Sequence, residues 1–203
     1  MSLSSDLQAL EEQLKTLPES AKNVLTAQNG AIYLVDLILF GAVKRSLSLG
    51  HGLIAMVNAT NMTCARAIVR MQIDTVSRLL AYTYVDDPEE VASKIIGGTP
   101  LSKFKSRDGH KLRDAYLIDK MTEAHSWVRE VYERTSGEIH FSEKQLFASI
   151  RSMDDETRTF QMLIGPFDTK YPEWSWSEVV GCFLRLNEIL LEVIEGYAAH
   201  KDG

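Results

Sequence analysis

The stretch Asn61-Met-Thr-Cys-Ala-Arg-Ala-Ile-Val-Arg-Met-Gln-Ile-Asp-Thr-Val-Ser-Arg-Leu-Leu-Ala-Tyr-Thr-Tyr84 decides the fold class of this chain. Its apolar side chains recur every three or four residues, as on one face of an α-helix: Ala65, Val69, Ile73, Val76 and Leu80. Its charged side chains recur every four residues and form a second stripe, a spacing at which opposite charges stabilise a helix: Arg66, Arg70, Asp74 and Arg78. The stretch therefore predicts a long amphipathic helix.

Similar helical patterns lie on both sides of this stretch. Apolar periodicity predicts further helices over 4–16, 31–57, 112–134 and 176–199. Pro18 is expected to end the first of them, and Gly137 follows the third as its terminator. A short helix is expected between Asp87, as its N-cap, and Gly97. Ser175 is the expected N-cap of the last helix.

The region after residue 140 gives two conflicting signals. Ser142 and Gln145 have the spacing of a helix capping box. In contrast, apolar residues alternate with polar ones as in two strands on either side of a turn at 154–156: Leu146, Ala148 and Ile150, then Phe160, Met162 and Ile164. We favour the hairpin.

These patterns predict a mainly α protein, an up-and-down bundle of five to six helices with a small β-hairpin near 146–164. A chain of 203 residues fits a single domain. We expect residues 1–28 to form an N-terminal helical appendage and residues 30–140 and 175–200 to form the bundle core. Residues 141–174 are expected to be a hairpin or loop insertion.

Composition limits the classes of partner. The chain has 22 Lys and Arg against 28 Asp and Glu, a formal net charge of −6, so bulk charge does not favour nucleic acid or anionic membrane. Cys64 and Cys182 are expected as buried, reduced thiols, which favours a cytoplasmic location. The N-terminus has no signal-peptide pattern, and the apolar run 31–43 contains Asp36 and is too short to cross a bilayer. We therefore expect no membrane contact.

The common catalytic and cofactor signatures are missing from the sequence. There is no Gly-rich phosphate loop and no G-x-S-x-G, H-E-x-x-H or C-x-x-C motif. No two of the five histidines have the helical spacing of a bundle metal site. We expect no metal and no cofactor, and a metal-binding or small-molecule-binding bundle is the weakest of three hypotheses.

One short segment carries residues suited to catalysis: Arg134-Thr-Ser-Gly-Glu-Ile-His140. A histidine, with an ordinary pKa of about 6.5, transfers protons at neutral pH. An arginine holds two phosphate oxygens and stabilises charge that develops in the transition state. Together they suit metal-independent RNA cleavage, in which a 2′-hydroxyl attacks the adjacent phosphate. The alternative is a structural role, in which His140 caps a helix or packs against neighbouring side chains.

In an all-helical chain of this size, the segment resembles the R-x(4–6)-H signature of the HEPN superfamily. The chain looks most like HEPN-like proteins in which a tyrosine and a serine precede the histidine, here Tyr132, Ser136 and His140. The helix with Arg70 and Asp74 is similar to the Arg-x-x-x-Glu helix of that family. The resemblance covers about residues 30–140 and the closing helix.

The resemblance implies a homodimer with the motifs of both subunits in one cleft, and an endoribonuclease of a toxin–antitoxin or other defence system with an antitoxin-like protein partner. It assigns phosphate binding to Arg134 and acid–base catalysis to His140. Ser136, Arg70 and Asp74 would support the substrate. Active family members usually have Asn, Asp or His directly after the arginine, where this chain has Thr135, and Asp74 replaces a glutamate. Whether the chain is an enzyme therefore stays open.

The stretch Lys103-Phe-Lys-Ser-Arg107-Asp-Gly-His110-Lys-Leu-Arg113 carries five positive charges and one negative charge. One interpretation is a mobile loop in which Lys103, Lys105 and Arg107 guide RNA phosphates and Phe104 or the nearby Tyr116 stacks on a base. The alternative is a solvated loop at the start of a helix.

The leading hypothesis is thus a cytoplasmic HEPN-like protein that binds or cleaves RNA or binds a nucleotide. The alternative is a non-enzymatic helical-bundle module that binds an unknown partner.

Overall fold

The structure, a computed structural model, describes residues 2–139, 143, 147, 149–165 and 167–202. These residues are mainly helical and include one two-stranded antiparallel sheet. The α-helices are α1 (Leu3–Thr26), α2 (Leu34–Asn58), α3 (Met62–Leu80), α4 (Pro88–Ile96), α5 (Asp114–Ala124), α6 (Trp127–Ile139) and α8 (Glu173–Asp202). Three short 3₁₀ helices are η1 (Ala27–Gly30), η2 (Ala81–Tyr84) and η3 (Leu101–Lys103), and the strands are β1 (Ile150–Asp154) and β2 (Thr159–Met162).

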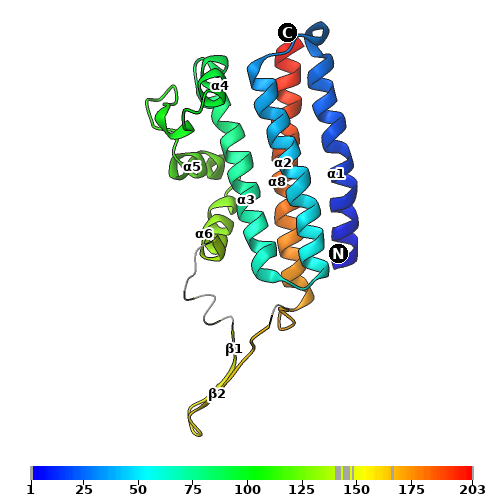
Figure 1. Ribbon diagram of the computed structural model, residues 1–203, viewed down its shortest axis with the longest axis vertical. Helices are drawn as coiled ribbons and strands as arrows, with labels where there is room; N and C mark the ends of the chain where they lie inside the picture. The colour runs from blue at the N-terminus through cyan, green and yellow to red at the C-terminus, as the bar shows by residue number, and fades with distance from the viewer. Residues whose placement is uncertain (1, 140–142, 144–146, 148, 166, 203) are drawn as a thin grey trace.

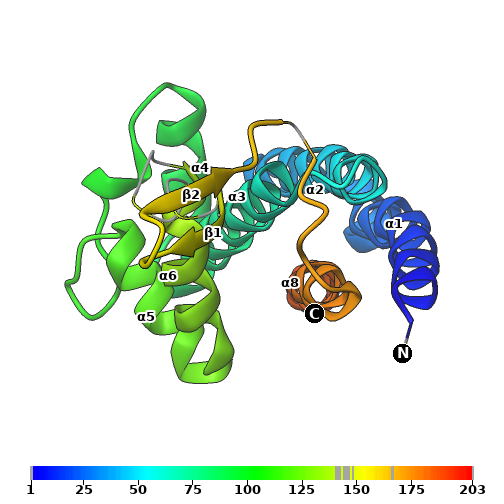
Figure 2. The same ribbon diagram turned by 90° about the horizontal axis from the view of Figure 1, so that it is seen from below.

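Four long helices, α1, α2, α3 and α8, lie side by side, and α4, α5 and α6 lie on the outer side of α3 (Figures 1 and 2). Helices α1, α2 and α3 alternate in direction, but α8 runs parallel to α1 (Figure 1). Hydrogen bonds join these two helices at both ends. The Leu3 amide donates to Glu173 at 3.0 Å, and the Lys201 ammonium donates to the Val24 carbonyl at 2.9 Å. The up-and-down order therefore holds for the first three helices only.

The main hydrophobic core lies between these four helices and includes residues of α5 and α6. Leu10, Leu53, Ile73 and Phe183 are fully buried in it, one from each long helix. Residues 1–28, expected as an appendage, contain α1, and α1 contributes to this same core. A second, smaller cluster lies beneath α4 and the 101–113 loop.

A buried polar network crosses the main core. The Gln72 amide of α3 donates to Ser46 of α2 and to Asn187 of α8, both at 2.9 Å. All three side chains are completely buried. The network therefore joins three of the four long helices.

Helix α1 continues through Pro18, so the expectation that Pro18 ends it is wrong. A proline inside a helix costs about 3 kcal/mol, since it lacks an amide proton and its ring crowds the preceding turn. Leu17, Ala21 and Val24 are buried on both sides of this position. Burial of these side chains offsets the local cost.

The single helix expected over 112–134 is two helices, α5 and α6. They are separated at His125, whose φ of −132° and ψ of 81° are not helical. Met121 of α5 and Val128 of α6 both lie in the main core. Gly137 does not end α6, which continues to Ile139.

A hairpin is confirmed over 150–162, within the expected range 146–164. Leu146 and Ala148 of its expected first strand lie outside the described residues, and Phe147 is helical. Strands β1 and β2 pair antiparallel, with Met153 opposite Phe160, and extend away from the bundle (Figure 1). The short helix after Asp87 is also confirmed, and the Asp87 carboxylate accepts from the Glu90 amide at 2.9 Å. Helix α8 starts at Glu173, so Ser175 lies in its first turn and is not the N-cap.

Helix α2 is long and apolar enough to cross a membrane by length and composition alone, a test that core helices also pass. Its Leu39, Val43 and Leu53 side chains are buried in the main core. Of the two cysteines, Cys182 is half-buried but Cys64 is exposed near the start of α3. The expectation of a buried thiol is therefore wrong for Cys64.

Candidate functional site

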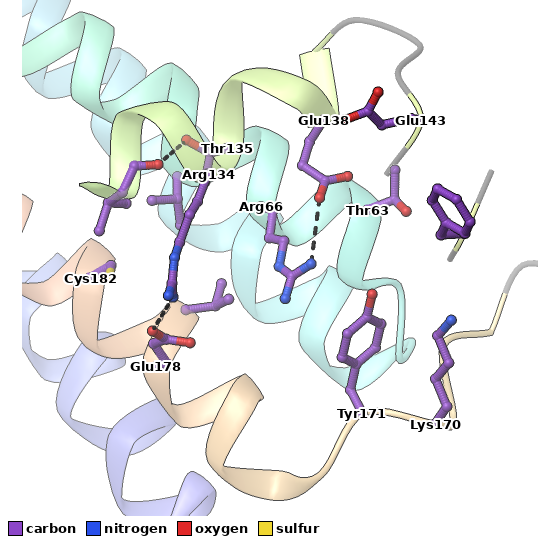
Figure 3. A pocket seen from close by; sticks show the side chains of 14 residues that line it. Thr63, Arg66, Arg134, Thr135, Glu138, Glu143, Lys170, Tyr171, Glu178 and Cys182 are labelled. Carbon is purple, nitrogen blue, oxygen red and sulfur yellow. Dashed lines mark hydrogen bonds and ion pairs between the residues drawn. The ribbon is translucent and has the colours of Figure 1, made fainter. Parts of the chain in front are cut away.

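Two pockets lie on different faces of α6. The α2 pocket has a volume of about 400 Å³ and is lined by Arg45, Arg70, Met71, Asp74, Tyr132, Ser136 and Ile139. The α8 pocket has a volume of about 620 Å³ and lies between α3, α6 and α8 (Figure 3). Residues two apart in a helix point about 200° apart around its axis. Ser136 and Arg134 therefore serve different pockets.

The α2 pocket is positively charged and its arginines are held in place. The Arg45 Nε donates to the Thr75 hydroxyl at 2.9 Å. The Arg70 guanidinium lies 4.0 Å from the centre of the Tyr132 ring, a cation–π contact. Within the described residues, neither arginine forms an ion pair with a carboxylate. The Ser136 hydroxyl donates to the Tyr132 carbonyl at 2.6 Å and keeps its oxygen as an acceptor.

Asp74 also lines the α2 pocket, but its charge is compensated. The Arg78 Nε donates to Asp74 at 2.6 Å, and the same guanidinium contacts Asp114 of α5 at 2.8 Å. This bond is the four-residue ion pair that the charged stripe of α3 predicts. Because Asp74 is paired with Arg78, the side of the pocket that contains Arg45 and Arg70 keeps a net positive charge.

Arg134 lines the α8 pocket and is held between two carboxylates. It extends from α6 toward Glu178 of α8, with its guanidinium 3.4 Å from that carboxylate (Figure 3). It also pairs with Glu130 at 2.9 Å. A phosphate at Arg134 would have to compete with both carboxylates. Cys182 lies on the wall of this pocket, and burial, with a smaller effect of Glu178, raises the pKa of its thiol to about 11.

The structure brings together three of the predicted site residues and separates a fourth. Arg70, Asp74 and Ser136 line the α2 pocket, whereas Arg134 lines the α8 pocket. His140 lies outside the described residues. The predicted residues therefore divide between two pockets.

The 101–113 loop is held by backbone hydrogen bonds and is not an open, mobile connection. The Leu112 amide donates to the Phe104 carbonyl at 3.0 Å, and Lys105 pairs with Lys111 across the turn. Phe104 is half-buried against the second core cluster, so its ring is not free to stack on a base. The Arg107 guanidinium donates to the Val85 carbonyl at 2.7 Å.

Lys103, Lys105 and Arg107 are exposed, but none of them lines either pocket on α6. Sequence reasoning missed Arg45 as a site residue. Two antiparallel helices joined by a turn near residue 60 place residue 45 beside residue 75. This symmetry about the turn is the feature of the sequence from which Arg45 could have been predicted.

Within the described residues, no group of three or more His, Cys, Asp or Glu side chains is placed to hold a metal ion. Comparison with protein-family models, curated proteins and solved structures finds no match for this chain. The function therefore has to be argued from the two pockets.

Proposed function

We propose that this protein is a HEPN-like RNA-binding protein and that its α2 pocket holds a phosphate of the RNA backbone. One observation carries the proposal: Arg45 and Arg70, from two different helices, line one pocket and form no ion pair within the described residues. An exposed or half-buried guanidinium without a carboxylate partner is available to an anion. Ser136 lines the same pocket, but its hydroxyl proton is donated to the Tyr132 carbonyl, so the two arginines supply the donors for the phosphate.

The geometry suits phosphate because the arginines are oriented before the ligand binds. Arg45 uses its Nε for Thr75, and its two terminal nitrogens stay as donors. Arg70 stacks on Tyr132, which limits the directions of its planar fork. A pocket with two arginines contacts few phosphates, in agreement with the acidic composition of the chain. RNA binding should therefore depend only modestly on salt.

Fluorescence anisotropy with labelled single-stranded RNA tests this site. The double variant Arg45→Ala/Arg70→Ala should bind at least about tenfold more weakly than the native protein. Its plot of log affinity against log salt should be flatter by about 0.7, because the pocket holds one phosphate and each phosphate contact to a single strand contributes about 0.7. The matched control is Arg185→Ala, which removes an exposed arginine of α8 that lines neither pocket. Equal losses in both proteins would reject the site.

Cleavage of the bound RNA is the second part of the proposal and derives from the HEPN resemblance. His140, four residues after Ser136 in sequence, is the proposed general acid or base. Arg45 and Arg70 replace Arg134 as the proposed phosphate ligands, because Arg134 is paired with Glu130 and Glu178. The assay is RNA cleavage in the presence of a chelator. The His140→Ala protein should lose cleavage and keep RNA binding. If the native protein binds RNA but does not cleave it, the hypothesis of a non-enzymatic binding module is supported instead.

The homodimer and the antitoxin-like partner are also proposed from the resemblance. Light scattering on the purified protein tests for the homodimer, and copurification of a second protein tests for the antitoxin-like partner. Cytoplasmic location stays part of the same proposal.

A further inference from the structure

The hairpin of β1 and β2 has one apolar face and one polar face. Residues that lie opposite each other in paired strands project from the same face, and the faces alternate along each strand. Met153 lies opposite Phe160, and Met162 lies opposite Ile150. Together they form one face, which we call the apolar face. The other face carries two polar pairs: Ser152 with Gln161, and Asp154 with Thr159.

The apolar face is open to solvent. Met153 and Phe160 are each 65% exposed, and Met162 is 44% exposed. Ile164 continues the two-residue spacing after β2 ends and is 87% exposed. The hairpin extends away from the bundle (Figure 1), so none of the described helices covers this face. An isolated two-stranded hairpin is only marginally stable in water, because it needs further strands or a packed face. The apolar face therefore indicates contact with another molecule.

Charges at the turn of the hairpin restrict the kind of partner. The turn 154–158 contains three exposed carboxylates, on Asp154, Asp155 and Glu156, and one arginine, Arg158. Its net negative charge opposes contact with RNA or with an anionic membrane. The side chains of the apolar face are uncharged. The partner that fits is therefore an apolar protein surface.

We propose that the apolar face packs against the apolar face of a second copy of this chain. In a dimer with two-fold symmetry both subunits use the same patch, and an uncharged apolar face is complementary to itself. When the two hairpins lie antiparallel and about 10 Å apart, as sheets in a sandwich do, Met153 and Phe160 of both subunits meet at the centre. The acidic turns then lie at opposite ends of the contact and do not repel each other.

The area of the apolar face agrees with a weak dimer. Large side chains of this kind offer roughly 200 Å² each, so the exposed fractions of Met153, Phe160, Met162 and Ile164 give on the order of 500 Å² per subunit. Two such faces bury about 1,000 Å² in total, which is the lower end for a specific interface. We therefore expect a dimer that dissociates on dilution. This inference rests on the homodimer of the proposed function, to which it assigns an interface, and not on RNA binding.

Light scattering over a range of protein concentrations tests the interface. The native protein should change from monomer to dimer as its concentration rises. Phe160→Glu should dimerise at least about tenfold more weakly, because it places a charge at the centre of the apolar contact. The matched control is Gln161→Glu, which adds the same charge to the polar face one residue away and should dimerise as the native protein does. Circular dichroism should show native helix content in both variants, since both positions are exposed in the single chain.

Cross-linking locates the contact on the hairpin. In a Cys64→Ser background, which removes the exposed thiol, a short bismaleimide should join two chains that carry Met153→Cys. It should not join two chains that carry Ser152→Cys, because Ser152 lies on the polar face. The remaining thiol, Cys182, reacts little, since burial raises its pKa to about 11.

A native protein that stays monomeric up to high micromolar concentration would overturn both this inference and the proposed homodimer. Equal dimerisation of the Phe160→Glu and Gln161→Glu proteins, or cross-links from Ser152→Cys as strong as those from Met153→Cys, would overturn this inference alone. The Arg45→Ala/Arg70→Ala protein should dimerise as the native protein does, because the α2 pocket is lined by helix residues outside the hairpin. Failure of RNA binding and failure of the hairpin contact are therefore measured separately.

Discussion

Asp36 and Lys201 form a completely buried ion pair that joins α2 to the end of α8. Their charged atoms are 2.8 Å apart, and their side chains are 0% and 2% exposed. The carboxylate also accepts from the Tyr197 hydroxyl at 2.8 Å and from the Tyr33 amide at 2.9 Å. Burial of two charges is tolerated because the carboxylate accepts three hydrogen bonds and the ammonium donates two, to Asp36 and to the Val24 carbonyl. The pair therefore fixes α2 and α8 but depends on both partners.

Lys201→Met should destabilise the protein by about 3–5 kcal/mol, because it leaves a buried carboxylate without its counter-ion. Urea denaturation measures the free energy of unfolding. The control is Lys22→Met, since Lys22 is exposed on α1 and lies 3.9 Å from an exposed glutamate. A loss of the same small size in both variants would contradict the role of the pair.

The same pair predicts a stability change in acid. Burial alone would raise the pKa of Asp36, but hydrogen bonds from Lys201, the Tyr33 amide and Tyr197 outweigh it and lower the pKa below its usual range. The unfolded state then binds the proton more tightly, so the contribution of Asp36 is present above about pH 4 and is lost as the pH falls below it. Urea denaturation between pH 6 and pH 3 should show a smaller decline for Asp36→Asn. If the free energy of unfolding falls equally in the native protein and in Asp36→Asn, the acid sensitivity does not come from Asp36.

At the scale of elements, the local preference of Pro18 to end a helix is opposed by the packing of the residues around it in α1. The proline lies inside α1 although its local effect is to end a helix. Pro18→Ala should therefore raise the free energy of unfolding, by up to about 3 kcal/mol. Pro88→Ala is the control, because Pro88 occupies the first turn of α4, where proline is tolerated. Urea denaturation measures both free energies of unfolding. An equal increase for Pro88→Ala would show that the effect of Pro18→Ala does not come from the position of Pro18 inside a helix.

The elements found from sequence are those whose signals are local. The Asp87 cap, the periodicity of 61–84 and the strand pattern of the hairpin each act within a few residues. The short helix, α3 and a hairpin over 150–162 are confirmed. The break at His125 has no such signal, because Leu117, Met121, Val128 and Val131 have the spacing of one continuous helix on both sides of it.

The candidate site was predictable to a similar extent. Arg70, Asp74 and Ser136 were predicted and do line one pocket. Arg45 joins them only through the packing of α2 on α3, and Arg134 is directed to the other side of α6 by its place in the helix. Contacts of this kind require the tertiary arrangement.

At the scale of the whole molecule, sequence predicted a helical bundle but not the parallel direction of α8. Residues of α8 complete the core that α1 begins, so the bundle depends on them. A chain ending at residue 172 should lose cooperative unfolding, as followed by circular dichroism during heating. A chain whose residues 150–162 are replaced by a Gly-Ser linker should keep it, since strand β2 is wholly exposed. A cooperative transition in the shortened chain would contradict this view.

The network of Gln72, Ser46 and Asn187 has a consequence for alternative packings of the bundle. In one such packing, one helix would be displaced along another by a turn, about 5.4 Å. Such a slide would separate the three polar side chains and leave a buried amide unpaired, at a cost of about 1–3 kcal/mol. The network thus sets the register of α2, α3 and α8, and with it the alignment of Arg45 and Arg70 across the α2 pocket.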